Sequence, residues 1–342
     1  MKKFFALAVL SMVQYVIVVG QTPVVSPASF FLDDKVLDVT VTTNIKNLRR
    51  NKMKPVWQPA NISIKLNDTL TVSETIRVQV RGKIRKTLCD IATLQFDFSN
   101  PTSPKLSKLR KLKWVGGCQN NRFGNELLLR EYLVYKMYNQ LTPLSFRVRL
   151  LNVQYVDSDQ KVRSYTQNAF LIESDEGLAE RNDCMEKKTG IYSTEENDRM
   201  QVGLVNIFEY MIANTDFSTG NRHNVKLFVP KSDTLRPPFV VPYDFDYAGI
   251  VDAPYAMPHE ILDIPTVRTR LYRGYPRTEI EIEELLKVFF AKKDNLLAVI
   301  TQSQQLPLKA KDDMVDFIKS FYKIIDNTLT TTQVFIKNAR TF

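Results

Sequence analysis

Alternating apolar and polar side chains mark the region from residue 30 to residue 115, where β-branched residues are also frequent. A period of two with β-branched enrichment is typical of strands that bury one face. Asn67-Asp68 predicts a hairpin turn between two of these strands. Gly82 marks either a turn or a close approach of the backbone to a bound group. The expected strands span residues 36–42, 61–66, 76–81, 92–98 and 111–117.

A helix is expected among these strands. Residues 125–140 are apolar nearly all round, which predicts a helix buried between layers. Two further strands are expected after it, over residues 145–155 and 168–173. A charged connector over residues 174–198 then leads into a region of mostly helical periodicity that holds one short pair of strands. The helices expected in this region span residues 200–213, 279–304, 310–327 and 329–338.

The order of these elements predicts an α+β protein with two lobes. A strand-rich N-lobe with one buried helix covers residues 21–173, and a helix-rich C-lobe covers residues 174–342. With 44% hydrophobic and 25% charged residues, few glycines and no evident repeat, the composition is that of a globular protein. We expect a ligand to bind in the cleft between the lobes.

The first twenty residues have the features of a secretory signal peptide. Met1-Lys-Lys is followed by an apolar run from Phe4 to Val19, and Val18-Val-Gly20 offers a cleavage site with small residues. An uncleaved membrane anchor is the alternative. We expect an exported protein that begins near Gln21 and has no transmembrane segment after cleavage. Its expected location is the periplasm or the exterior of a Gram-negative cell.

Cysteine and histidine usage narrows the chemistry. In an oxidising compartment two of the three cysteines should pair, and Cys89 with Cys118 is the favoured pair, which leaves Cys184 over. No cysteine spacing resembles a zinc site. His223 and His259 are too few for a histidine metal cluster, so any metal would be bound by carboxylates and amides.

A net charge of +10 raises the question of a nucleic-acid partner. The basic clusters at residues 46–54, 77–86 and 105–113 lack interleaved aromatic side chains. Solvated faces explain most of these basic clusters, and an anionic ligand such as a nucleotide explains part of two of them. No nucleic-acid partner is expected.

Three polar residues stand beside apolar runs in the middle of the chain. Asp216 lies at the end of an apolar helical pattern. Asn224 precedes the strand-like run 225–228, and Asp244 follows the run 239–241. Phosphoryl transfer needs a carboxylate that orients or deprotonates the attacking group, and an Asn and an Asp that hold Mg²⁺ against the phosphates. Asp216 could supply the orienting carboxylate, and Asn224 and Asp244 could hold the metal ion.

The same region resembles a known group of proteins. The segments Ile212-Ala-Asn-Thr-Asp216, Asn224-Val-Lys-Leu227 and Pro242-Tyr-Asp244 resemble the catalytic and metal motifs of atypical kinases. The nearest groups are the spore coat protein H (CotH) kinase family and the HipA-like kinases. The resemblance to CotH-like proteins of Bacteroidetes-type bacteria covers roughly residues 75–255. It also includes Arg81-Gly82 with Arg85, the helix around Glu131, Phe170-Leu-Ile-Glu173, and Tyr243-Asp-Phe-Asp-Tyr247.

The resemblance implies a two-lobed atypical protein-kinase-like fold that uses ATP and Mg²⁺, or Mn²⁺. It implies that Asp216 is the catalytic base that orients the acceptor hydroxyl. Asn224 and Asp244 would be metal ligands, and Asp246 a second acidic ligand. The structural alternatives are a turn residue bonded to local backbone at 216, a capping amide at 224 and a solvated acid at 246.

Glu131 is expected to meet a cation, because an unpartnered carboxylate inside an apolar helix costs several kcal/mol. In a kinase that cation is a phosphate-binding lysine on a neighbouring strand, whereas a core ion pair with Arg147 or Arg149 is the structural alternative. The strand at 93–98 presents Gln95 and Asp97 in place of that lysine. The candidates for the nucleotide-binding residues are therefore Lys113 first, then Lys83, Arg85 and Lys86, with Gly82 alone standing for the glycine-rich loop.

Two functions follow, and a third is weaker. The first is an exported ATP-dependent kinase that phosphorylates a protein or a small hydroxyl acceptor. The second is an inactive pseudokinase that acts as a binding or assembly module at the cell envelope. The third is a secreted sugar- or polymer-binding β-domain, which exposed aromatic side chains such as Trp57 and Trp114 would indicate.

Overall fold

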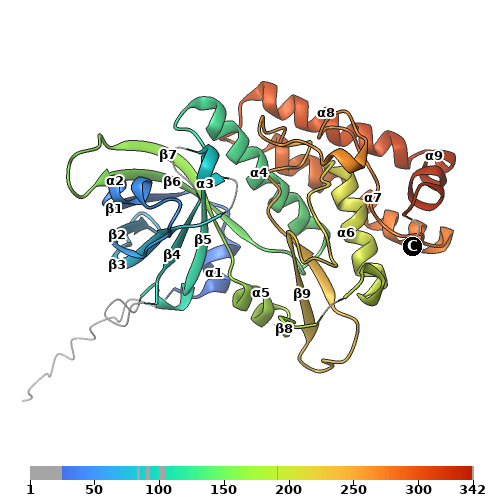
Figure 1. Cartoon of the computed structure of the whole chain (residues 1–342), viewed down its shortest axis with the longest axis horizontal. Helices are drawn as coiled ribbons and strands as arrows, with labels where there is room; N and C mark the ends of the chain where they lie inside the picture. Colours follow the sequence, from blue (N-terminus) through green and yellow to red (C-terminus); the bar gives the residue numbers. More distant parts are fainter. Residues whose placement is uncertain (1–24, 83–84, 90–92, 100–104, 191, 341–342) are drawn as a thin grey trace, which may run out of the picture.

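The structure, a computed structural model, describes residues 25–82, 85–89, 93–99, 105–190 and 192–340 (Figure 1). The predicted signal peptide and the candidate Lys83 lie outside the described residues. Within the described ranges, no helix is both long and apolar enough to span a membrane.

The strand-rich region forms a barrel that is closed by seven strands within the described residues (Figure 1). The strand order is β1-β2-β3-β4-β5-β7-β6, and β6 returns to pair with β1 in parallel, with Val39 opposite Val153. Alternate positions of β3 are buried, as its period of two predicts. The strands are β1 (Leu37–Thr43), β2 (Gln58–Lys65), β3 (Thr71–Val80), β4 (Leu94–Asp97), β5 (Lys111–Gly116), β6 (Val148–Asp157) and β7 (Tyr165–Ile172).

The barrel has an aromatic interior. Trp114 is fully buried, stacks on Phe96 with ring centroids 4.2 Å apart, and donates a hydrogen bond to the Tyr155 hydroxyl at 2.9 Å. Trp114 therefore belongs to the core and gives no support to an aromatic binding surface. The short helices around the barrel are α1 (Pro27–Leu32), α2 (Ile45–Arg50), α3 (Arg85–Leu88) and η1 (Ser107–Leu109).

Helix α4 (Arg122–Leu141) confirms the predicted buried helix. It begins where the Asn121 side chain accepts a hydrogen bond from the Gly124 N–H, which caps the helix. Its apolar residues occur on every side, because it packs against β6 and β7 of the barrel and against α7 of the C-terminal region. The helix thus lies between the barrel and the C-terminal helices (Figure 1).

The C-terminal region combines helices with a small sheet of order β10-β9-β8. The segment predicted as a charged connector contains α5 and β8, where Cys184 pairs with Pro230 and Leu178 is fully buried. The elements are α5 (Asp175–Arg181), β8 (Cys184–Glu186), η2 (Thr194–Glu196), α6 (Arg199–Met211), β9 (Val225–Pro230), β10 (Phe239–Pro242), η3 (Glu260–Leu262), α7 (Glu279–Thr301), α8 (Leu308–Ile325), α9 (Thr328–Thr332) and the π-helical turn η4 (Gln333–Lys337).

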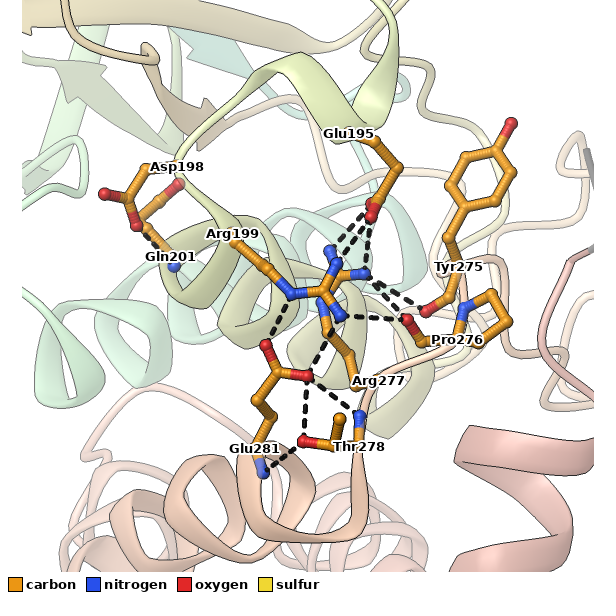
Figure 2. Close-up of polar contacts among 9 residues, drawn as sticks. All are labelled: Glu195, Asp198, Arg199, Gln201, Tyr275, Pro276, Arg277, Thr278 and Glu281. Atoms are coloured by element: carbon orange, nitrogen blue, oxygen red, sulfur yellow. Dashed lines mark hydrogen bonds and ion pairs between the residues drawn. The ribbon is translucent and has the colours of Figure 1, made fainter.

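Two arginines join the start of α6 to the start of α7 (Figure 2). Arg277 is buried and forms a two-pronged ion pair with Glu195, with both N–O distances at 2.8 Å. Arg199 contacts Glu195 at 2.9 Å and also bonds Glu281, whose carboxylate accepts the N–H of the cap residue Thr278 at 2.8 Å. This arrangement, called here the arginine clasp, ties the start of α7 to the start of α6, the helix that leads into the first loop described below.

The mixed α+β class is confirmed, but the N-terminal part differs from the expected kinase-like lobe. It is a closed barrel rather than one half of an ordinary two-lobed kinase. Closure depends on the parallel β1–β6 pair, which joins segments more than a hundred residues apart. Helix α4 shares one continuous core with the C-terminal helices. The division at residue 173 therefore stays a prediction.

Cys89 and Cys118 form a disulfide, as predicted, and Cys184 is a free, buried thiol.

Candidate functional site

Two loops carry the acids predicted from the sequence, and backbone hydrogen bonds join them. The first, residues 212–224, follows α6, and the second, residues 243–250, follows β10. The Gly249 N–H donates to the Ala213 carbonyl at 3.0 Å, and the Ile250 N–H donates to the Ile212 carbonyl at 3.1 Å. The residues Asp216, Asn224, Asp244 and Asp246 on these loops are called here the acid site.

The β9–β10 register brings the far ends of the loops together. Pro242 pairs with Val225, and the next position continues the ladder because the Tyr243 N–H donates to the Asn224 carbonyl at 2.9 Å. Asn224 is therefore opposite the residue that precedes Asp244. Asn224 lies just before β9 and Asp244 lies just after β10, so the register places the amide and the acid at the same end of this strand pair.

Gly249 explains how closely the loops approach. A Cβ atom at this position would lie 2.3 Å from the Val267 carbonyl oxygen and 2.8 Å from the Ala213 Cβ. Contacts that short are not tolerated, so a side chain would force the two loops apart.

The loops also share an uncommon backbone conformation. Ala213, Arg222, Asn224 and Asp244 have φ values of 54°, 50°, 54° and 66°. Asn and Asp tolerate the left-handed region better than other non-glycine residues, which explains their occurrence at two of these positions. Such conformations concentrate at functional sites.

Asp216 is held by the two polar side chains that follow it in the same loop. Its Oδ1 lies 2.9 Å from His223 Nε2, and its Oδ2 accepts a hydrogen bond from Asn224 Nδ2 at 3.0 Å. Asn224 also donates to the Asp216 carbonyl at 2.8 Å. Burial raises the pKa of Asp216, and His223 opposes that shift. About a third of the Asp216 side chain stays exposed, so an acceptor could reach it.

Buried polar groups support this loop from below, and the sequence reasoning missed them. The Asp216 N–H donates to Asn214 Oδ1 at 3.0 Å, and the Asn214 N–H donates to the Glu209 carbonyl oxygen at 2.8 Å. Glu209 on α6 is 1% exposed, and burial raises its pKa to about 8. From the other side, Arg273 donates to the Phe217 carbonyl at 3.0 Å and to that of Thr215.

Asp244 and Asp246 differ in how they are held. The Asp244 N–H donates to the Tyr135 hydroxyl of α4 at 2.7 Å, whereas its carboxylate accepts no hydrogen bond from the described residues. Burial, followed by the charge of Asp246, raises the pKa of Asp244. Asp246 Oδ2 accepts hydrogen bonds from Arg85 Nε and from the Tyr255 hydroxyl, both at 3.0 Å.

Arg85 is the cation that meets Glu131. Arg85 Nη2 lies 2.5 Å from Glu131 Oε2, and both side chains are largely buried. Although burial alone would lower the pKa of Arg85, Glu131 and Asp246 raise it well above its usual range. Burial raises the pKa of Glu131 to about 8, against the lowering by Arg85.

The expectation of a cation at Glu131 is confirmed, and Arg85 is one of the candidates, although Lys113 was placed first and Arg147 or Arg149 was the structural alternative. Arg149 pairs instead with Asp33 at 2.9 Å, because β6 turns its side chain toward the end of α1. Arg147 bonds Glu173 through its backbone: its N–H donates to the Glu173 carboxylate at 3.1 Å, and its carbonyl accepts the Glu173 N–H at 2.9 Å.

Lys113 and Gly82 lie apart from this ion pair. Lys113 Nζ on β5 stands 4.0 Å from the centroid of the Tyr243 ring and forms no ion pair with the described residues. Burial lowers its pKa to about 8, and Asp175 and Asp244 act against that shift. Gly82 has φ +92°, and a Cβ there would lie 2.7 Å from Thr93 Oγ1, so this glycine serves the turn after β3.

Several oxygen atoms of the acid site accept no hydrogen bond from the described residues and are of the kind that binds a divalent cation with few protein ligands. Among the described residues, no group of three or more His, Cys, Asp or Glu side chains is arranged to hold a metal. The Asp244 carboxylate, the second oxygen of Asp246 and the Asn224 Oδ1 carry no protein hydrogen bond in the described part of the chain. Mg²⁺ is usually held by one or two carboxylates together with water and substrate phosphates, so the chemistry of these donors fits Mg²⁺, and a bound ion stays a prediction.

A cavity lies away from the acid site. It has a volume of about 390 Å³ and opens between α4 and α7, beside Tyr132, Lys136 and Gln302. The nucleotide cleft expected at the acid site stays a prediction.

The comparisons with known proteins add little. No protein-family model matches the sequence, and no curated protein matches it. The chain is similar to the crystal structure of a Helicobacter pylori proinflammatory kinase, CtkA, at 9% identity and a TM-score of 0.37. The similarity covers 66% of this chain and 90% of that one. A likeness of this size assigns neither fold nor function, and the resemblance to the CotH and HipA-like kinases stays a prediction.

Proposed function

We propose that this protein binds a magnesium–nucleotide complex at the acid site and transfers the terminal phosphoryl group to a hydroxyl acceptor. One observation carries the proposal: Asp216, Asn224 and Asp244 come from two loops that backbone hydrogen bonds hold together. The Asp244 carboxylate meanwhile has no hydrogen-bond donor among the described residues. A half-buried carboxylate that accepts no hydrogen bond favours a bound cation, because partial removal of a negative charge from water is costly.

Each residue has a role in this proposal. Asp244 and Asp246, with the Asn224 amide oxygen, would hold Mg²⁺, which neutralises phosphate charge when bound. Asp216 is partly exposed and oriented by His223, so it can accept the acceptor's proton. The bond from acceptor oxygen to phosphorus forms, the bridging bond between the β- and γ-phosphates breaks, and ADP leaves with the electron pair. The proton passes to Asp216.

The nucleotide phosphates would meet cations from the barrel. Lys113 is half-buried without an ion-pair partner in the described residues, and it interacts with Asp244 electrostatically. Arg85 is already fixed by Glu131 and Asp246. Gly82 and Glu131 would act indirectly, through the turn and through Arg85. Mn²⁺ could replace Mg²⁺ because both accept oxygen ligands.

A second candidate is a binding or assembly module of the same fold without transfer activity. Two observations favour it. Arg85 already neutralises Asp246, and β4 offers Gln95 and Asp97, which bond to Gln79 and Arg77, rather than a lysine. Export to the cell envelope belongs to both candidates and is likewise proposed.

The test combines binding with transfer. The protein with its disulfide intact is titrated with ATP in a calorimeter, with and without Mg²⁺ or Mn²⁺. It is then incubated with ATP labelled at the γ-phosphate, and labelled protein and inorganic phosphate are measured. Metal-dependent binding with transfer supports the kinase proposal, and binding alone supports the second candidate. No metal-dependent binding would overturn the kinase proposal.

A further inference from the structure

We infer that the Cys89–Cys118 disulfide is a positioning element of the acid site, because it holds Arg85 against Glu131 and Asp246. The inference rests on the proposed function for its consequence, a dependence of nucleotide binding on the disulfide. Its structural part, the coupling between disulfide and ion pairs, can be judged without that function.

Arg85 lies in an excursion of the chain between β3 and β4. The Arg81 N–H donates to the Thr93 carbonyl at 2.8 Å and closes the neck of this excursion. Helix α3 is four residues long, and the Cys89 N–H donates to the Arg85 carbonyl at 3.0 Å. Arg85 and Cys89 are thus one helical turn apart, and a single turn fixes the position of one relative to the other.

Helix α3 has no apolar anchor of its own. It buries no apolar side chain, since Leu88 is 52% exposed, and its one largely buried side chain is Arg85 in the ion pairs with Glu131 and Asp246. A helix of one turn is unstable in isolation, because nucleation fixes several dihedral angles for one hydrogen bond. Something outside the helix must therefore keep it in place.

The disulfide supplies that anchor. Cys89 is 1% exposed and is bonded to Cys118, which follows β5 and precedes α4. Glu131 lies farther along the same helix α4, so the bridge ties the excursion that carries Arg85 to the segment that leads to its partner acid. A second contact, from Lys52 Nζ to the Cys89 carbonyl, is 3.3 Å long and only partly buried.

Loss of the bridge should release Arg85. Glu131 and Asp246 would then face each other and Asp244 without the guanidinium between them. Nucleotide phosphates, which are anionic, would meet an acid site with one cation fewer, so their affinity should fall.

A double-mutant cycle on stability tests the structural part. Arg85→Leu is measured by thermal unfolding in the parent protein and in the Cys89→Ser/Cys118→Ser background. If the disulfide positions Arg85, the loss of Tm caused by Arg85→Leu shrinks in the disulfide-free background, since contacting or coupled residues are not additive. Arg149→Leu is the control, because the Arg149 side chain is likewise buried but pairs with the exposed Asp33, which belongs neither to α3 nor to the acid site. Its loss of Tm should be the same in both backgrounds. Equal losses for Arg85→Leu in the two backgrounds would overturn the inference.

A kinetic measurement covers the case in which the serine variant does not fold. Dithiothreitol reduces the native disulfide to two thiols and is itself oxidised to its cyclic disulfide. Because the rate of thiol–disulfide exchange depends on access to the bridge, and the Arg85 ion pairs hold the segment that covers it, Arg85→Leu should speed this reduction and Arg149→Leu should not. Equal rates for the two variants would contradict the inference.

Nucleotide titration then tests the consequence. Parent protein and the serine variant are titrated with ATP and Mg²⁺, and a raised Kd in the serine variant supports positioning. If the parent protein binds no nucleotide, only the proposed function is overturned. The double-mutant cycle on Tm still tests the coupling between the disulfide and Arg85. An unchanged Kd, with the parent protein binding, overturns the functional consequence.

Discussion

Arg85 and Asp246, which are 161 positions apart in the sequence, form an ion pair with a distance of 3.0 Å between Nε and Oδ2. The pair joins the barrel excursion to the loop after β10, and Glu131 of α4 contributes the second acid. Three parts of the chain therefore meet at one guanidinium. The charge of Asp244 also acts on this guanidinium.

Asp216 is expected to act on the transferred proton and not on nucleotide binding. Asp216→Asn should lower the rate of phosphate transfer roughly 10²- to 10⁴-fold, because an amide cannot accept the acceptor's proton. The Kd for ATP with Mg²⁺ should stay unchanged. Both are measured on the same preparation, with Asp312→Asn on the outer surface of α8 as the control. Equal losses of binding and transfer would assign Asp216 a structural role.

In the arginine clasp, replacing each of the two arginines should lower the free energy of unfolding by a different amount. Arg277 is 1% exposed and Arg199 is 47% exposed, although both bond to Glu195. Arg277→Leu should lower the free energy of unfolding by about 3 kcal/mol, because one member of a buried pair is lost. Arg199→Leu should cost less than about 1 kcal/mol. Denaturant unfolding measures both, and similar costs would contradict the difference drawn from burial.

Glu209 predicts a specific pH dependence of stability. Burial raises its pKa to about 8, so between its ordinary value and about 8 the folded protein binds a proton that the unfolded chain has released. This contribution is fully present at low pH and is lost as the pH rises through about 8. Glu209→Gln removes it, so the variant should gain stability relative to the parent between about pH 5 and about pH 8.

The measurement is denaturant unfolding of both proteins across this pH range. Glu284→Gln, at an exposed ion pair with Lys287, is the control and should show no such trend. A difference between parent and Glu209→Gln that stays constant with pH would mean that Glu209 is charged in the folded state.

The strands and helices could be read from periodicity, but closure of the barrel could not. The alternation in β3 and the all-round apolar character of α4 are local signals, and they gave the correct elements. The parallel pairing of β1 with β6 depends on contacts between distant segments that no local pattern encodes. Helix α3 was also missed, because a single turn without a buried face has no periodic signal.

Some residues of the candidate site could likewise be predicted from the sequence, and others could not. Asp216, Asn224 and Asp244 could be singled out because each stands beside an apolar run, and the structure brings their loops together. That Glu131 needs a cation followed from burial, but choosing Arg85 over Lys113 among the candidates required the path of the chain between β3 and β4. Glu209 could have been found, since it is an acid in an apolar helix like Glu131.

The most direct test concerns Asp244. Asp244→Asn removes the charge and keeps a residue that tolerates φ 66°. Asp252→Asn is the matched control, because Asp252 has φ 58° on the next turn of the same segment and pairs with Arg268. Thermal unfolding is followed with and without ATP and Mg²⁺ at about 100 times the Kd, where a bound ligand adds about 2.7 kcal/mol to stability. A metal-dependent rise in Tm of the parent protein and of Asp252→Asn, absent in Asp244→Asn, is the result expected here. A rise of the same size in all three, or in none, would contradict a magnesium–nucleotide site at Asp244.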